Sequence, residues 1–274
     1  MKNDMIKKPN LSQEYTTEQV MELKRCADDP VYFMRTYMKV MHPTRGAIPF
    51  DLYPYQERAV KSFRENKDTI VMMGRQQGKT TVIAASLLWF ACFHFEKYIL
   101  VASKDNDAAL DVMGRIRFGY EELPFWLKPG CLYFNRHEIS FDNNSTIKSS
   151  ATTENTGRGR SVSLLMLDEL AFVKREIQMA MWASLAPTLS TGGSCIISST
   201  PNGDQDLFAT LWREAESLLN GFKTVFAPWS EHPERDEAYK IEMTAKVGEL
   251  MFRQEYNCEF ISSDPLLINT LKLN

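Results

Sequence analysis

The sequence lacks the groups of cysteine and histidine that hold metals or build disulfide frameworks. Its five cysteines never form a C-x-x-C pair, and its four histidines are equally scattered. This distribution argues against a Cys/His zinc site and a disulfide-stabilised secreted domain, and it favours a reducing cytosol. No apolar run reaches the roughly 18 residues of a membrane span, and no signal-peptide stretch follows the charged start, MKNDMIKKPN.

Excess positive charge is missing as well, because the net charge is −3. The chain therefore has no global signature of nucleic-acid binding, although one face could still be basic. There are no internal repeats or low-complexity tracts, and 44% hydrophobic residues are typical of a globular protein. A length of 274 residues suits one large α/β domain, or a core with a small appended subdomain.

Apolar runs alternate with amphipathic segments through the middle of the chain. The expected strands are TIVMMG, KYILVAS, VSLLMLDE and SCIISSTP, and the expected helices are KTTVIAASLLWFACF, NDAALDVMGRIRFGYEEL and IQMAMWASLAPTL. This alternation predicts an α/β fold with a mainly parallel sheet flanked by helices on both faces. HEISFDNNSTIKSSA has the pattern of an inserted hairpin.

The two ends of the chain differ from this core. TTEQVMELKRCADD and PVYFMRTYMKV predict two helices, and HPTRGAIPFDLYPYQ is typical of a connecting loop. Near the other end, FKTVFAPW predicts a short strand and RDEAYKIEMTAKVGELMFRQEYN a helix. We therefore predict a core at 48–220, and a small second subdomain in which 1–47 packs with 221–262.

The segment MMGRQQGKTT ends like a phosphate-binding loop but lacks the first glycine of the pattern. The pattern G-x-x-x-x-G-K-[ST] requires a glycine where Met73 stands, and Gly74 comes one place late. Because the segment follows a strand and opens a helix, its amides are suited to phosphate oxygens. Lys79 would contact the β- and γ-phosphates, and Thr80 would help to hold Mg²⁺. The alternative is an ordinary helix start with a solvated lysine.

A carboxylate pair strengthens the first interpretation. SLLMLDEL is an apolar strand that ends in Asp168 and Glu169. A carboxylate at the tip of a buried strand can bind Mg²⁺, and the glutamate after it can orient the attacking water. The alternative is that Asp168 and Glu169 are two solvated charges at a strand end. The presence of a GKT segment directly after another expected strand makes this alternative improbable.

Two further segments fit the same site. SCIISSTPNG would bring Ser199 and Thr200 beside the γ-phosphate, with Pro201 ending the strand. A loop of this kind can differ between the triphosphate and diphosphate states, as a relay requires. Gln56, in LYPYQERA, carries a donor and an acceptor that match adenine N6 and N7, unless it is an ordinary surface glutamine.

Three arginines are candidates for stabilising charge on the γ-phosphoryl group. Arg75 lies inside the loop and could act from the same chain. Arg158 and Arg160 lie in TTENTGRGRSVS, a Gly-rich segment before the carboxylate strand. Each could be solvated, contact a phosphate backbone, or reach the nucleotide of a neighbouring subunit, and we favour Arg158 for the last role.

The whole set of motifs resembles the ATPase domain of the large terminase subunit, the DNA-packaging motor of tailed bacteriophages. The matching segments are DPVYFMRTYMKVMHP, GAIPFDLYPYQ, GRQQGKTT, GRGRS, LLMLDELAF, SSTPNG and FRQEYNCEF. In that family a deviant loop with Arg-Gln before x-G-K-T accounts for the missing first glycine. The resemblance implies an ASCE-type P-loop NTPase, with ATP and Mg²⁺ as cofactors, that powers translocation of double-stranded DNA into a procapsid.

The resemblance also implies roles for individual residues. Catalysis falls to Glu169, with Arg75 acting in cis or Arg158 in trans. Mg²⁺ would be held by Thr80 and Asp168. The implied nucleotide-binding residues are Gln56, Gly74, Arg75, Gln76, Gln77, Gly78, Lys79, Thr80 and Thr81. Coupling falls to Ser199-Thr200-Pro201, in which serine replaces the commoner first threonine and retains its hydroxyl.

The implied partners are double-stranded DNA, the portal protein and the small terminase subunit, with no membrane. We expect this chain to be monomeric in solution and to self-associate into a ring on the portal. Its location would be the cytoplasm of the infected bacterial host, with transient docking at the procapsid portal vertex. Family members continue into a nuclease domain, so 263–274 would begin the linker to it, and no nuclease activity is expected from these residues.

Two other functions compete with this one. A superfamily-2 helicase or translocase shares a glutamine motif, GKT and DE, but it needs a second RecA-like domain that the residues after the fourth strand are too few to form. An ATP-dependent assembly module that scarcely hydrolyses ATP would not need the water-polarising Glu169.

Overall fold

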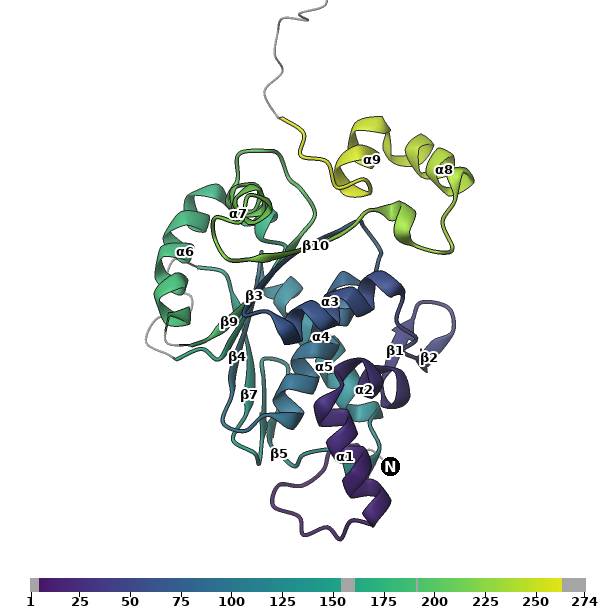
Figure 1. Ribbon diagram of the computed structural model, residues 1–274, viewed down its shortest axis with the longest axis vertical. Coiled ribbons are helices and arrows are strands. Elements are labelled where there is room, and N and C mark those ends of the chain that lie inside the picture. Colours follow the sequence, from purple (N-terminus) through teal and green to yellow (C-terminus); the bar gives the residue numbers. More distant parts are fainter. Residues whose placement is uncertain (1–4, 154–160, 191, 263–274) are drawn as a thin grey trace, which may run out of the picture.

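The computed structural model describes residues 5–153, 161–190 and 192–262, and its centre is an eight-stranded sheet (Figure 1). The strands lie in the order β10-β3-β9-β8-β4-β7-β6-β5. Their bounds are β3 Asp68–Met73, β4 Tyr98–Ser103, β5 Cys131–Phe134, β6 Glu138–Phe141, β7 Thr146–Ala151, β8 Leu164–Asp168, β9 Ser194–Ser199 and β10 Lys223–Ala227. All pairs from β10 to β7 are parallel, and the two pairs beyond β7 are antiparallel. The predicted mainly parallel sheet is confirmed.

Helices cover both faces of this sheet (Figure 1). On one side of the sheet lie α3 Pro54–Glu65, α4 Lys79–Phe93 and α5 Asn106–Glu122, with α1 Thr17–Asp28 and α2 Pro30–Tyr37 packed outside them. On the other side lie α6 Arg175–Leu189 and α7 Leu207–Glu216. Strand β3 serves both cores, because Val71 and Met73 join the first and Ile70 and Met72 the second. A strand buried on both faces must be apolar throughout, which explains the unbroken run in the sequence.

The segment expected to be a connecting loop contains regular structure. Strands β1 (Lys39–His42) and β2 (Gly46–Pro49) form an antiparallel hairpin, and α3 begins at Pro54. The prediction of a loop was wrong here, because Gly46 supplies a positive φ of 70° after the turn and proline is well suited to the first position of a helix.

The predicted hairpin at HEISFDNNSTIKSSA is confirmed as the antiparallel pair β6–β7. It is not an insertion beside the core, however, because β7 also pairs in parallel with β4. The hairpin therefore extends the central sheet.

The C-terminal region differs from the expected small subdomain. Strand β10 pairs in parallel with β3 and belongs to the central sheet. Helices α8 (Glu237–Val247) and α9 (Glu249–Glu255) pack around Trp229, far from α1 and α2 (Figure 1). Residues 221–262 therefore do not form one unit with the N-terminal helices. The core boundaries at 48 and 220 otherwise stay a prediction, and 263–274 lie outside the described residues.

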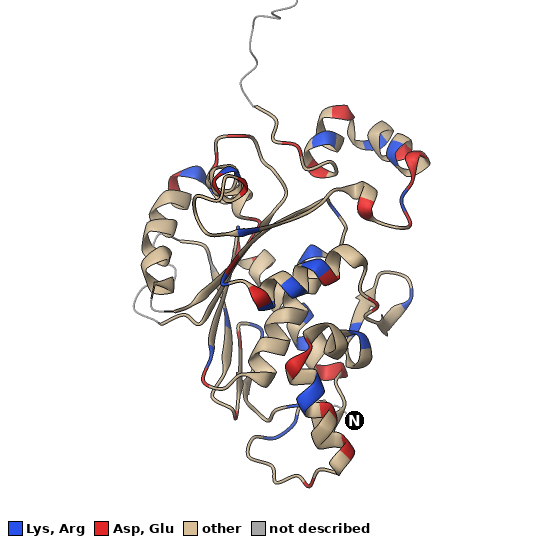
Figure 2. Ribbon diagram, in the orientation of Figure 1, with Lys and Arg blue, Asp and Glu red and all other residues tan. Residues whose placement is uncertain are grey.

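Charged side chains of both signs are interspersed over the ribbon (Figure 2). The described residues also contain three short 3-10 helices, η1 Phe125–Leu127, η2 Leu170–Phe172 and η3 Trp229–Glu231. Within the described ranges, no helix has the length and apolarity needed to cross a membrane.

Candidate active site

The loop between β3 and α4 forms a concave turn at the carboxyl edge of the sheet. Gln76 and Gly78 both adopt left-handed backbone conformations, with φ of 60° and 74°. Gly78 precedes the first residue of α4, Lys79, and no side chain caps this helix. The first amides of α4 are therefore available to an anion, as a phosphate-binding loop requires.

Gln56 supports the loop from behind. Its Nε2 donates to the Gln77 carbonyl oxygen at 3.0 Å, and its Oε1 accepts from the Tyr53 amide at 3.1 Å. A Cβ at Gly78 would lie 2.6 Å from Gln56 Nε2, so glycine is needed for this contact. Because Gln56 is 4% exposed, an adenine contact requires its amide to leave these partners. Recognition of adenine by Gln56 stays a prediction.

The C-terminal segment holds the loop from the side. The Gly74 amide donates to the Ala227 carbonyl oxygen at 2.9 Å, and the Arg75 amide donates to that of Glu255 at 2.8 Å. A Cβ at Gly74 would lie 2.7 Å from the carbonyl oxygen of Tyr256, which leaves no room for a side chain. Two backbone segments therefore meet at the displaced glycine.

Arg235 provides a further link to the loop. Its guanidinium donates to the carbonyl oxygens of Arg75 at 3.1 Å and Gln76 at 2.8 Å, and it lies 4.8 Å from the ring centroid of Tyr239. The Gln77 side chain also bonds across to this region, because its Nε2 donates to the Pro228 carbonyl oxygen at 2.6 Å. The loop is thus fixed largely by residues far along the chain.

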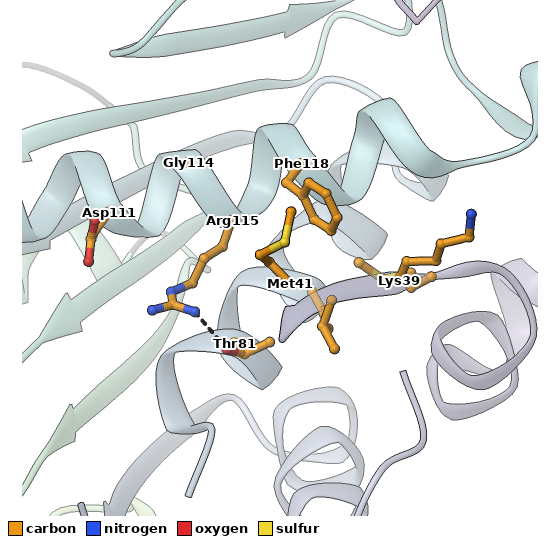
Figure 3. Close-up of a pocket in the computed structure, with 10 residues that line it drawn as sticks. Lys39, Met41, Thr81, Asp111, Gly114, Arg115 and Phe118 are labelled. Carbon is orange, nitrogen blue, oxygen red and sulfur yellow. Dashed lines mark hydrogen bonds between the residues drawn. The ribbon is translucent and has the colours of Figure 1, made fainter. Parts of the chain in front are cut away.

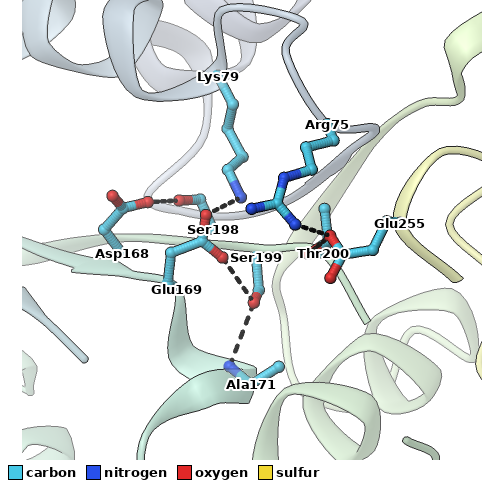
Figure 4. A network of polar contacts seen from close by, with 9 residues as sticks. All are labelled: Arg75, Lys79, Asp168, Glu169, Ala171, Ser198, Ser199, Thr200 and Glu255. Atoms are coloured by element: carbon cyan, nitrogen blue, oxygen red, sulfur yellow. Dashed lines mark hydrogen bonds and ion pairs between the residues drawn. The ribbon is translucent and has the colours of Figure 1, made fainter. Parts of the chain in front are cut away.

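The two carboxylates lie at the end of β8, as the sequence predicted (Figure 4). Asp168 is 4% exposed, and its Oδ1 accepts from Ser198 Oγ on the neighbouring strand at 2.5 Å. Burial raises the pKa of the Asp168 carboxyl, an effect that the Lys79 ammonium opposes and the Glu169 charge reinforces. Glu169 has a left-handed backbone at φ 53°, and its Oε1 lies 3.0 Å from Lys79 Nζ.

The proposed coupling residues begin at the last residue of β9, and two of them contact carboxylates (Figure 4). Ser199 Oγ donates to Glu169 Oε2 at 3.4 Å and accepts from the Ala171 amide at 3.2 Å. Thr200 Oγ1 donates to Glu255 Oε2 at 3.0 Å. Pro201, which is buried, follows the end of the strand. This segment therefore joins the carboxylate strand to α9.

Arg75 forms an ion pair with the buried Glu255. The distance between Arg75 Nη1 and Glu255 Oε2 is 3.6 Å. Each loop cation thus has a carboxylate partner, since Lys79 pairs with Glu169. The other arginine candidates, Arg158 and Arg160, lie outside the described residues.

A cavity of about 490 Å³ unites these groups. Its lining includes the predicted residues Gly74, Arg75, Gln76, Gln77, Gly78, Lys79, Thr80, Thr81, Glu169 and Thr200. The predicted residues Gln56, Asp168, Ser199 and Pro201 are not part of this lining. Four charged residues that line or support the cavity were not predicted from the sequence, namely Lys104, Arg115, Arg235 and Glu255. Glu255 falls in FRQEYNCEF, which had been noted as a matching segment without a role.

Strand β9 lies between the loop strand β3 and the carboxylate strand β8. An additional strand in this position, with a glutamate after the strand-end aspartate, defines an ASCE-type P-loop NTPase fold. The family model described as "Terminase large subunit, T4likevirus-type, N-terminal" matches residues 70–274. The chain therefore belongs to the family of large terminase subunits.

Individual relatives agree with this assignment. The large terminase subunit of Thermus phage G20c is 28% identical over 231 residues, in a match that covers 72% of this chain and 46% of the relative. The corresponding protein of Thermus virus P23-45 gives the same values. The chain thus spans about half the length of the curated relatives it matches.

Solved structures share the fold. The ATPase domain of the Thermus phage P74-26 large terminase superposes with a TM-score of 0.62 at 22% identity, covering 77% of this chain and 95% of that domain. The HK97 bacteriophage large terminase gives 0.70 at 18% identity, covering 85% of this chain and 55% of that protein. A large terminase of a thermophilic bacteriophage, solved in complex with ADP, gives 0.61 at 11% identity, with 77% and 54% covered.

Proposed function

We propose that this chain is an Mg²⁺-dependent ATPase domain whose hydrolysis of ATP powers translocation of double-stranded viral DNA into a procapsid. The observation that carries the proposal is the convergence of Lys79, Glu169 and Thr200 on one cavity beside the phosphate loop. Structures of a large terminase from a thermophilic bacteriophage in complex with ADP and with ATP-gamma-S support the proposal of nucleotide binding.

The residues present fit Mg²⁺. Asp168 is a buried carboxylate whose charge a cation would compensate, and Thr80 supplies a hydroxyl in the cavity at the start of α4. Within the described ranges, no three His, Cys, Asp or Glu side chains converge as a metal site. The remaining ligands would therefore be phosphate oxygens and water, as is usual for Mg²⁺. The bound ion would neutralise charge on the phosphates.

The protein groups divide the remaining work. Lys79 and the loop amides bind the phosphates, so Lys79 must exchange its Glu169 partner for phosphate oxygen. Glu169 is then free to orient the attacking water and accept its proton. Ser199 contacts the same carboxylate, and Thr200 contacts α9, so a change at Glu169 can pass to the C-terminal helices.

Membership of the family supports a proposal for the partners. We propose that the chain acts with double-stranded DNA, the portal protein and the small terminase subunit, and that it assembles as a ring on the portal. Its place would be the cytoplasm of the infected bacterial host, docked transiently at the procapsid portal vertex.

Steady-state phosphate release with ATP and Mg²⁺ tests the proposal. Glu169→Ala should retain ATP binding but lower turnover by roughly 10²-fold or more, because the water loses its base. Lys79→Ala should lose ATP binding itself. Glu65→Ala, an exposed carboxylate at the end of α3, is the control and should match wild type.

Two results would contradict the assignment. Equal turnover in wild type and Glu169→Ala would make the chain an assembly module without this catalytic base. Equal loss of ATP binding in Glu169→Ala and Lys79→Ala would remove the division between binding and catalysis.

A further inference from the structure

Two cations outside the phosphate loop also line the nucleotide cavity. Lys104 follows β4, and Arg115 lies on α5. Neither residue belongs to a motif that predicts a role for it. Their positions follow from the pairing of β4 with β8 and from the packing of α5 beside α4.

Lys104 emerges beside the water-polarising carboxylate. Ser103 pairs with Asp168 in the parallel β4–β8 ladder, so Lys104 and Glu169 are the next residues to leave the same edge of the sheet. Lys104 is exposed, and its Nζ lies 5.8 Å from the ring centroid of Phe172. The adjacent Asp105 is occupied elsewhere, because its Oδ1 accepts from the Ala108 amide as the cap of α5.

Arg115 lies at the start of α4 instead. Its Nη1 donates to Thr81 Oγ1 at 3.0 Å (Figure 3). Arg115, Thr81 and Met41 line both the nucleotide cavity and a second cavity of about 280 Å³ next to it. The carboxylate one helical turn away, Asp111, lines the second cavity and not the first.

The charges of the cavity are unevenly matched. Its two carboxylates, Glu169 and Glu255, already pair with Lys79 and Arg75. In the part of the chain that the structure describes, neither Lys104 nor Arg115 lies within ion-pairing distance of a carboxylate. The excess positive charge of the cavity is therefore carried by Lys104 and Arg115. ATP remains an anion when it binds Mg²⁺, and charge-assisted contacts to phosphate oxygen are strong.

We propose that Lys104 and Arg115 are phosphate-contacting residues with different targets, an inference that rests on the proposed nucleotide-binding function. Lys104 contacts the γ-phosphate, because it lies on the Glu169 side of the cavity. Arg115 contacts the phosphates that ATP and ADP share, because the Thr81 hydroxyl holds it beside the first turn of α4.

Titration of the full chain with ADP and with ATP-gamma-S, in the presence of Mg²⁺, tests the division. Lys104→Gln should weaken binding of ATP-gamma-S by roughly tenfold while changing ADP binding less than about twofold. Arg115→Gln should weaken both by roughly tenfold. Lys104→Arg should restore the preference for the triphosphate, which separates lost charge from a folding defect.

Lys39→Gln is the matched control. Lys39 lines the second cavity but not the first, and it pairs with Glu122 at 3.0 Å. Both nucleotides should bind this variant as they bind wild type.

Three results would overturn the inference. The first is an equal loss of ADP and ATP-gamma-S binding in Lys104→Gln. The second is unchanged binding of both nucleotides in Arg115→Gln. The third is a loss of DNA binding in Lys104→Gln while nucleotide binding stays intact. If wild type bound neither nucleotide, the proposed function itself would fail. If wild type bound both nucleotides but Lys104→Gln and Arg115→Gln changed their binding in the same way, only this inference would fail.

Discussion

The oxygen and the nitrogen of the Gln56 side-chain amide both form hydrogen bonds within the protein. Its two candidate roles, support of the loop and recognition of adenine, can therefore be separated by experiment. Gln56→Ala removes the bonds to Gln77 and Tyr53 and should lower the free energy of unfolding by about 1–3 kcal/mol. If Gln56 acts by supporting the loop, the affinities for ATP and GTP should fall together. Binding titrations with both nucleotides check this expectation. A selective loss of ATP affinity would instead show that the amide leaves its partners and reads adenine.

Glu255 places a buried negative charge in the cavity that is proposed to receive a triphosphate. Glu255→Gln keeps an acceptor for Thr200 but removes the charge that attracts Arg75. We expect ADP affinity to rise by up to roughly tenfold, because repulsion ends and Arg75 is released to the phosphates. Calorimetric titration measures the change.

The matched control for this substitution is Glu249→Gln, at the exposed start of the same helix. It should leave ADP affinity unchanged. Unchanged affinity in Glu255→Gln as well would show that the phosphates lie beyond the influence of this carboxylate.

At the level of elements, the phosphate loop and the segment from β10 to α9 form one packed unit. Gly74→Ala should lower the free energy of unfolding by about 1–3 kcal/mol, because its Cβ meets the backbone of Tyr256 and Trp229. Gly114→Ala is the control, because a Cβ there meets nothing within 4 Å. Inside α5 alanine should be slightly stabilising. Denaturant unfolding monitors both variants, and equal stabilities would contradict the packing argument.

The sequence was informative where a local pattern determines the element. Strand β8 is buried throughout and α4 opens directly after the loop, so periodicity was enough to locate both. Strand β10 was predicted as a strand but placed in the wrong unit, because a parallel partner 154 positions earlier, Lys223 opposite Thr69, leaves no local trace. The hairpin β1–β2 has strands of four residues beside prolines, which resemble loop sequence.

At the candidate site, too, a residue could be predicted only where a local sequence pattern fixes its position. Lys79 and Glu169 belong to motifs with fixed spacing to their elements, so they could be named in advance. Lys104 and Glu255 could not, because their approach to the loop depends on strand register and on the packing of α9. Gln56 stays a prediction as a nucleotide-binding residue, and its hydrogen bond to the Gln77 carbonyl oxygen could not be predicted from a local pattern.

At the scale of the whole assembly, Arg158 remains the candidate for action between subunits. Mixing Arg158→Ala chains with Lys79→Ala chains should restore part of the ATPase activity in an assembled motor. The reason is that an intact arginine from one chain would then face an intact nucleotide site on the other. Steady-state phosphate release across mixing ratios measures the rescue. Activity that only averages the two variants would argue for action in cis.

The displaced glycine has a consequence for the redesign of this loop. Grafting the common G-x-x-x-x-G-K-T sequence onto this chain would put a glycine at position 73 and a side chain at position 74. That side chain would clash with the Tyr256 carbonyl oxygen even without a bound nucleotide. A successful graft would therefore have to exchange the chain around Trp229 and Tyr256 together with the loop. The position of this glycine is set by a packing contact within the protein, and it carries no information about which nucleotide binds.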